Sequence, residues 1–156
     1  MGRNPAQDEA QKSVPKEADL YSWAVRQAEL LRAGRLAEID PVAVAEEIDD
    51  VGEEQYDRLE SALRVLMLHL LKRDCQPGTR SRSWALSVLE QRKRSQRQLR
   101  KNPGLKSRLD EALESAYEDA RLEAASETGL PMRAFPVGAP LRLRRDHETA
   151  DRLAGR

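Results

Sequence analysis

PVAVAEEIDDVGEEQYDRLESALRVLMLHLLKRD, residues 41–74, is the stretch of sequence that decides the fold. Its apolar residues recur every three or four positions, which places them on one face of an α-helix. Toward its end, Val65–Leu71 is apolar on almost every side, so other helices must surround it. The helix is expected to begin at Asp40-Pro41. Asp40 can accept hydrogen bonds from free amides, and proline at the first position lacks an N–H that would have no partner.

The length of this segment predicts an interruption at Val51-Gly52. Helices longer than about 25 residues are unusual in globular proteins when they have no internal caps. Glycine inside a helix costs about 1 kcal/mol relative to alanine. We therefore expect a kink or break there, and we expect the part before it, Val42–Val51, to offer apolar surface to a second copy or to another protein.

Composition indicates one soluble helical domain in a reducing compartment. Of the 156 residues, 35% are charged, and the basic and acidic residues balance at 27 each. A net charge of zero gives no overall field toward nucleic acid or an anionic membrane. The single Cys75 excludes an internal disulfide. No apolar run reaches the roughly 18 residues of a membrane span, and the N-terminus has no secretory signal, so we expect a cytoplasmic protein.

Three further helices are predicted around the central one, at residues 20–33, 80–102 and 105–129. Their boundaries follow from the cap at Asp19, from Gly34, from the break at Asn102-Pro103-Gly104 and from Gly129. The predicted fold is an all-α antiparallel bundle of four main helices. It occupies residues 18–137, between a disordered segment 1–17 and a flexible basic tail 138–156. The expected core contains Trp23, Leu63, Leu66, Leu70, Trp84, Leu89, Leu109 and Leu113.

Five blocks of the sequence resemble a known family. They are YSWAVRQAELLRAGRLAEID, EEIDDVG, LMLHLLK, SRSWALSVLEQR and AYEDARLEAASETGLP. In this order they resemble a bacterial family known as domain of unknown function 29, over roughly residues 19–136. The resemblance implies a compact helical domain and brings no catalytic residues. The tail after Phe135-Pro136 departs from the usual ending of the family.

A basic run is the first candidate binding site. Residues 72–106 hold eleven Lys and Arg against Asp74 and Glu90. Basic helices bind phosphate backbones by releasing counterions, which would make this a nucleic-acid-binding protein. If the helices are antiparallel, however, residues 92–101 lie beside the acidic residues of 53–62 and of 110–118, and we favour this internal neutralisation. The candidate nucleic-acid-binding or anion-binding residues are Arg80, Arg82, Arg92, Arg94, Arg97 and Lys101.

Arg80 and Arg82 are less well explained by neutralisation. They lie at or before a helix N-terminus, where the helix dipole disfavours cations. With Lys72 and Arg73 they could form a small anion pocket at the turn. Pairing with Asp74 or with a carboxylate of the N-terminal helix is the interpretation we favour.

A metal site has weak support. Dimetal bundles combine Glu residues with Glu-x-x-His motifs. Positions 46, 47, 50 and 54 carry acids, but Leu66 lies three residues before His69 and Arg144 lies three before His147. We expect no metal or other cofactor and interpret His69, the weak candidate ligand, as a packed histidine.

Nothing in the sequence indicates catalysis. Basic neighbours could lower the pKa of Cys75 toward a reactive thiolate, but neither histidine is near it in sequence, so a small residue filling a turn is the better interpretation. No P-loop, GxGxxG, GxSxG or HExxH motif is present. The function is not given by the sequence. The best hypothesis is a non-catalytic binding or assembly module that acts on an unknown protein partner or on itself; the alternatives are nucleic-acid binding and, less favoured, a bundle metalloprotein.

Overall fold

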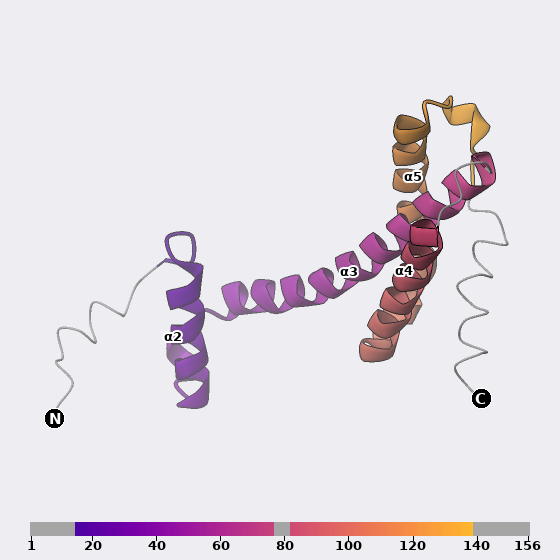
Figure 1. Cartoon of the computed structure of the whole chain (residues 1–156). Helices are drawn as coiled ribbons and strands as arrows, with labels where there is room; N and C mark the ends of the chain where they lie inside the picture. Colours follow the sequence, from indigo (N-terminus) through magenta and orange to yellow (C-terminus); the bar gives the residue numbers. More distant parts are fainter. Residues whose placement is uncertain (1–14, 77–81, 139–156) are drawn as a thin grey trace, which may run out of the picture. The chain divides into compact units, whose positions relative to one another are not determined.

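The computed structural model describes residues 15–76 and 82–138, except for the side chains of 82–84. These residues form four α-helices and three short 3-10 helices and contain no strand (Figure 1). The predicted all-α fold is therefore confirmed. The expected disorder of the termini concerns residues that lie almost entirely outside the described ranges. Residues 15–17 are an exception, because they belong to a turn in which the Ala18 amide donates to the Pro15 carbonyl at 3.0 Å.

The chain divides into two compact units, Met1–Gly52 and Glu53–Arg156. The sequence suggested one bundle domain over residues 18–137. The division falls inside the long helix α3 (Pro41–Cys75), at its single glycine. Each unit is described by itself below.

The first unit contains α2 (Leu20–Arg32), the 3-10 helix η2 (Leu36–Glu38) and the beginning of α3. Asp19 caps α2 as predicted, because its carboxylate accepts from the Ser22 amide at 3.0 Å. Gly34, with φ 69°, ends the helix in a conformation that favours glycine. Asp40 likewise caps α3 by accepting from the Ala43 amide at 3.0 Å.

No break occurs at Val51-Gly52, where the sequence predicted one. The helix α3 continues through Gly52 for 35 residues. A Cβ at Gly52 would meet no heavy atom within 4 Å, so no close packing requires glycine there. The penalty of about 1 kcal/mol for a helical glycine is too small to interrupt a helix that has good helix formers on both sides.

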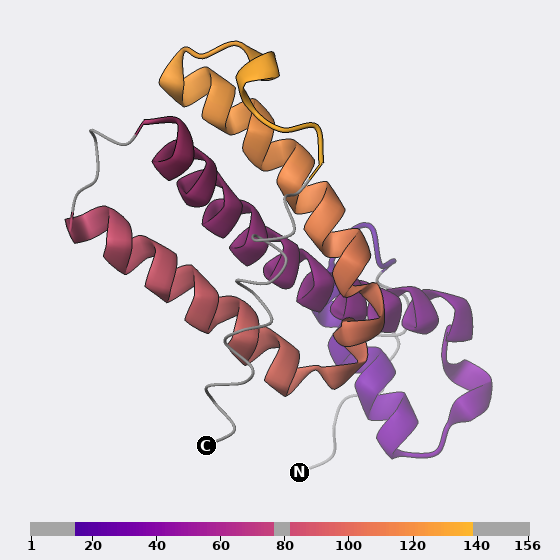
Figure 2. The same cartoon turned by 90° about the vertical axis from the view of Figure 1, so that its right-hand side faces the viewer.

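The second unit is built from α3 after Gly52, α4 (Arg82–Lys101), the 3-10 helix η4 (Pro103–Arg108), α5 (Leu109–Thr128) and η5 (Met132–Ala134). Figure 2 shows α4 and α5 alongside this part of α3. In the same view (Figure 2) α4 begins beside the end of α3 and runs in the opposite direction, and Gln55 on α3 contacts Gln98 on α4. Pairs between Arg64 and Glu123 and between Lys72 and Glu127 show that α5 runs in the same direction as α3.

One continuous core fills the second unit. Leu63, Leu66, Leu70 and Leu113 are buried as predicted, and the residues around Met67 lie at its centre. The alanines of α5 at 112, 116, 120 and 124 are buried too, so their small side chains let α5 approach its neighbours closely. Phe135, beyond the last long helix, is 2% exposed and completes this core.

Four of the predicted core residues need separate comment. Trp23 is buried, but in the first unit. Leu109 packs against the core of the second unit and is only partly buried, and the side chain of Trp84 lies outside the described residues. Leu89 was assigned wrongly, since it is 47% exposed. The buried side of α4 follows Val88, Ser95 and Leu99 instead, and a residue adjacent to Val88 is turned by about 100° from that line.

Candidate functional site

The inner face of α4 attaches it to α3. Ser95 is fully buried, and its hydroxyl donates to the Arg92 carbonyl at 3.0 Å. Next to it, the Gln98 amide nitrogen donates to the carbonyl and side-chain oxygens of Gln55 at 3.1 and 2.9 Å. This is close to the register expected by counting outward from the turn between the two helices.

The outer face of α4 has a different composition. It carries exposed cations and two exposed leucines at helical spacing, and we call this set the basic stripe: Leu86, Leu89, Lys93, Arg94, Arg97, Arg100 and Lys101. Leu86 and Leu89 are 58% and 47% exposed. A hollow on this face is lined by part of the stripe and by Glu90. The stripe therefore combines positive charge with accessible apolar surface.

The five cations of the basic stripe form no ion pair with any residue that the structure describes. The sequence favoured their neutralisation by acids on the two neighbouring helices. That expectation is wrong for Lys93, Arg94, Arg97, Arg100 and Lys101.

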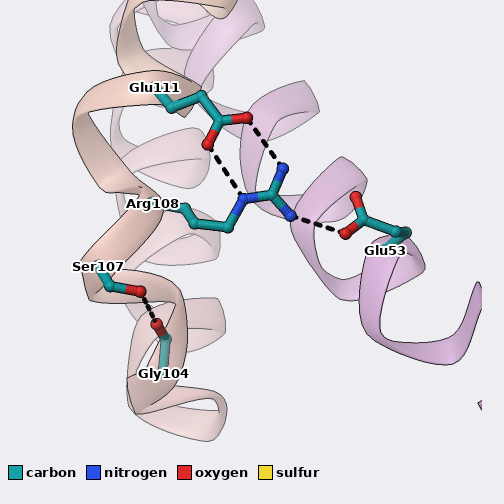
Figure 3. Close-up of polar contacts among 5 residues, drawn as sticks. All are labelled: Glu53, Gly104, Ser107, Arg108 and Glu111. Carbon is teal, nitrogen blue, oxygen red and sulfur yellow. Dashed lines mark hydrogen bonds and ion pairs between the residues drawn. The ribbon is translucent and has the colours of Figure 1, made fainter. Parts of the chain in front are cut away.

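Arg108 explains why two of the expected acids are engaged elsewhere. It lies at the junction of η4 and α5, where Figure 3 shows its guanidinium between two carboxylates. It donates to Glu53 at 2.7 Å and to Glu111 at 2.9 and 3.1 Å. The same guanidinium lies 3.9 Å from the centroid of the Tyr56 ring, a cation–π contact. One arginine thereby joins α3 to the start of α5.

The titration of the groups around Arg108 follows from these contacts. Hydrogen bonds from Arg108 lower the pKa of Glu111, and the bonds to Glu111 and Glu53 raise the pKa of Arg108. Burial raises the pKa of Tyr56, and the charge of Glu111 adds to that effect. Arg108 and Glu111 are thus charged at neutral pH and Tyr56 is protonated, and the contacts of this cluster hold α3 and the start of α5 together.

Two further ion pairs join α3 to α5. Arg64 binds Glu123, and Lys72 binds Glu127. Arg73 contacts Asp74 at 3.2 Å. Two members of the anion pocket suggested at the turn, Lys72 and Arg73, are therefore engaged with carboxylates.

The six arginine and lysine residues predicted to bind nucleic acid or an anion lie in different environments. Arg94, Arg97 and Lys101 share the outer face, whereas Arg92 is half-buried on the inner side. Arg80 lies outside the described residues, and Arg82 is the first residue of α4 with its side chain undescribed. Sequence reasoning missed Leu86, Lys93 and Arg100 as members of the same face, although the spacing of 86, 93, 97 and 100 places them within one helical stripe.

His69 and Cys75 give no support to metal or nucleophilic chemistry. Within the described ranges, no three His, Cys, Asp or Glu side chains are placed to hold a metal ion. Burial lowers the pKa of His69, and the positive charge of Lys72 adds to this. The half-buried Cys75 packs against the core, and burial followed by the charge of Asp74 raises its pKa. This is the opposite of the activation that its basic neighbours suggested.

No helix in the described part of the chain is both long and apolar enough to cross a membrane.

Comparison with known proteins gives one family. Comparisons with curated proteins and with solved structures gave no match. A family model described as "Domain of unknown function DUF29" matches residues 16–148. The match continues past Phe135-Pro136, so the departure from the family expected there is not found. With its helical second unit and most of its length matched, the chain belongs to the DUF29 family.

Proposed function

We propose that this protein is a non-catalytic binding module that recognises an acidic protein surface through the basic stripe on α4. The observation that supports this is the contrast among its cations. Those that join helices, such as Arg64, Lys72 and Arg108, are paired with carboxylates. The five on the outer face of α4 are exposed and have no ion pair among the described residues.

The chemistry of the stripe indicates what kind of partner it suits. Exposed cations attract an anionic surface and accelerate its association. Leu86 and Leu89 add apolar area that a polyanion cannot use but a protein surface can. A cytoplasmic location belongs to the same proposal, because the single cysteine suits a reducing compartment.

Nucleic-acid binding is the second candidate, and the same cations favour it. Lys93 to Lys101 covers about 12 Å of helix at about 1.5 Å per residue, a distance over which several cations can contact a phosphate backbone. Against it, the apolar residues of the stripe, Leu86 and Leu89, would remain exposed in such a complex. Glu90, on the same face, would repel phosphates and carboxylates alike and does not distinguish the two candidates.

Titration with two polyanions distinguishes the candidates. The full-length chain is titrated at low salt with poly-L-glutamate and with oligo(dT), for the wild type and for Arg94→Glu with Arg97→Glu. Tighter binding of poly-L-glutamate, lost in the double variant, supports the proposed function. Tighter binding of oligo(dT), with a steep dependence on salt, supports the alternative.

A matched control reverses two exposed charges outside α4. Lys106→Glu with Arg133→Glu changes the net charge by the same amount, and neither residue forms an ion pair in the described part. This variant should bind like the wild type. If neither polyanion binds, or if the control weakens binding equally, the basic stripe is an ordinary solvated helix face and the proposal is wrong.

A further inference from the structure

We propose that the partner of the basic stripe is a second copy of this chain, bound through the acidic segment Val42–Val51 of its α3. This inference rests on the binding role proposed above for α4. It identifies the acidic protein surface from the charges and apolar groups that the chain itself exposes.

The acidic segment has free charges and exposed apolar side chains. It contains four acids and no Lys or Arg. Two of its acids, Glu46 and Glu47, pair with Lys16 at 2.9 Å each. The other two, Asp49 and Asp50, are exposed and form no ion pair with any described residue.

One exposed apolar residue of the segment lies on the same side of the helix as these carboxylates. Val42 is 68% exposed, Ile48 66% and Val51 61%. At about 100° per residue, Val42 shares a side with Asp49 and Asp50, whereas Ile48 and Val51 lie on the opposite side. The burial of Val42 against other apolar surface would be favourable, at about 25 cal/mol per Å².

The acidic segment and the basic stripe are complementary in three respects. Both lie on a single helix, and their lengths are similar, about 14 Å from Val42 to Val51 and about 17 Å from Leu86 to Arg97. Their charges are opposite. Both also have exposed aliphatic surface on the charged side, Leu86 and Leu89 in the stripe and Val42 in the acidic segment, so ion pairs and apolar contacts can form in the same interface.

Each surface is exposed within its own unit, and each can therefore meet its counterpart on a second molecule. The basic stripe is on the side of α4 opposite to Val88, Ser95 and Leu99, the residues that pack within its own unit. Each copy carries one surface of each kind. Two copies can therefore exchange both contacts in a closed pair, or a row of copies can form head to tail.

Sedimentation of the full chain over a wide range of concentration tests the inference. The wild type should associate at low salt, and the association should weaken at about 0.5 M salt because exposed charges are screened. Arg94→Glu with Arg97→Glu should weaken association by about tenfold or more, and Asp49→Lys with Asp50→Lys should do the same. All of these residues are exposed, so helicity measured by circular dichroism should not change.

Combining the four substitutions in one chain is the decisive variant. It reverses two charges on each surface and should restore association toward the wild-type level. Since its net charge is zero, like that of the wild type, the control below is needed to separate this pairing from a general effect of net charge. Lys106→Glu with Arg133→Glu serves as the control of equal charge change. Leu86→Ser with Leu89→Ser should weaken association with no change in charge.

The possible negative results distinguish failure of this inference from failure of the proposed function. A chain that stays monomeric at every concentration overturns this inference, while α4-dependent binding of poly-L-glutamate would still support the proposed function. Association that is unaffected by either charge reversal, or not restored by the exchange, also overturns it. If the assemblies contain co-purified nucleic acid and dissociate on nuclease treatment, the partner is a nucleic acid and the inference is wrong.

Discussion

Burial keeps two titratable side chains of the second unit neutral at the end of α3. Burial and the charge of Lys72 lower the pKa of His69, so the imidazole is uncharged at neutral pH. Burial and the charge of Asp74 raise the pKa of Cys75, so the thiol is not ionised. A neutral imidazole and a protonated thiol against an apolar core stabilise packing, and neither is prepared for nucleophilic chemistry.

Replacing His69 should reduce the sensitivity of stability to acid. The imidazole binds its proton less readily in the folded chain than in the unfolded chain, so the unfolded state takes up more protons as pH falls below about 6.5. The wild type therefore loses stability from that pH down through the lower pKa of the folded state. His69→Gln should lose less between about pH 7.5 and about pH 5, as measured by urea unfolding.

Comparing the free energies of unfolding of the two proteins separates the effect of His69 from that of the carboxylates, which also titrate in acid. If the wild type and His69→Gln lose the same free energy of unfolding over this range, protonation of His69 does not destabilise the folded state. The buried environment assigned to its side chain is then wrong.

At the scale of the element, Gly52 is a position of low helix propensity within α3. Its neighbours in the chain are helical, its φ is not positive, and space is open where a Cβ would lie. Glycine therefore contributes only its conformational entropy there, which alanine would reduce in the unfolded chain.

Substitution of Gly52 by alanine should stabilise the protein by about 1 kcal/mol. The midpoint of thermal unfolding, followed by circular dichroism, should rise by roughly 2–4 °C. Gly129→Ala is the matched control, because Gly129 ends α5 at φ 70° and alanine is strained in that conformation. It should lower the midpoint. A decrease with Gly52→Ala would mean that flexibility at this glycine contributes to the folded state.

Most element boundaries could be predicted from local chemistry. Asp19, Asp40, Gly34 and Gly129 act as caps where the sequence placed them, because capping depends on residues only a few positions away. The outward orientation of Leu89 could not be predicted, because the apolar residues of α4 are too few to fix which side faces the core. The pairing of Arg108 with Glu53 depends on the 3-10 turn of η4, which local periodicity does not reveal.

At the scale of the whole molecule, the two units differ in the size of their cores. In the described part of the first unit, only Trp23 and Leu30 are buried apolar residues. The second unit has a continuous core of seventeen buried residues. The all-α class followed from composition and periodicity, but the division at Gly52 did not. It depends on how contacts are distributed along α3, which the sequence does not show.

Hydrogen exchange should reveal this difference directly. Local opening is easiest where few apolar contacts are buried. Amides of α2 should therefore exchange at least about tenfold faster than those of α5, which corresponds to about 1.4 kcal/mol in opening free energy. Mass spectrometry of peptides from the two helices measures both in one sample. Equal protection would show that α2 is stabilised by contacts beyond its two buried residues.

The position of Phe135 has a consequence for synthesis on the ribosome. This side chain closes the core from beyond α5, and the segment that carries it is attached where the Tyr117 hydroxyl donates to the Pro136 carbonyl at 3.0 Å. Because Phe135 follows α5 in the sequence, α3, α4 and α5 leave the ribosome before it, and their shared interior lacks this ring until residue 135 has emerged. The last step in maturation of this unit is then the arrival of a single aromatic ring, and chaperones have until that moment to bind it.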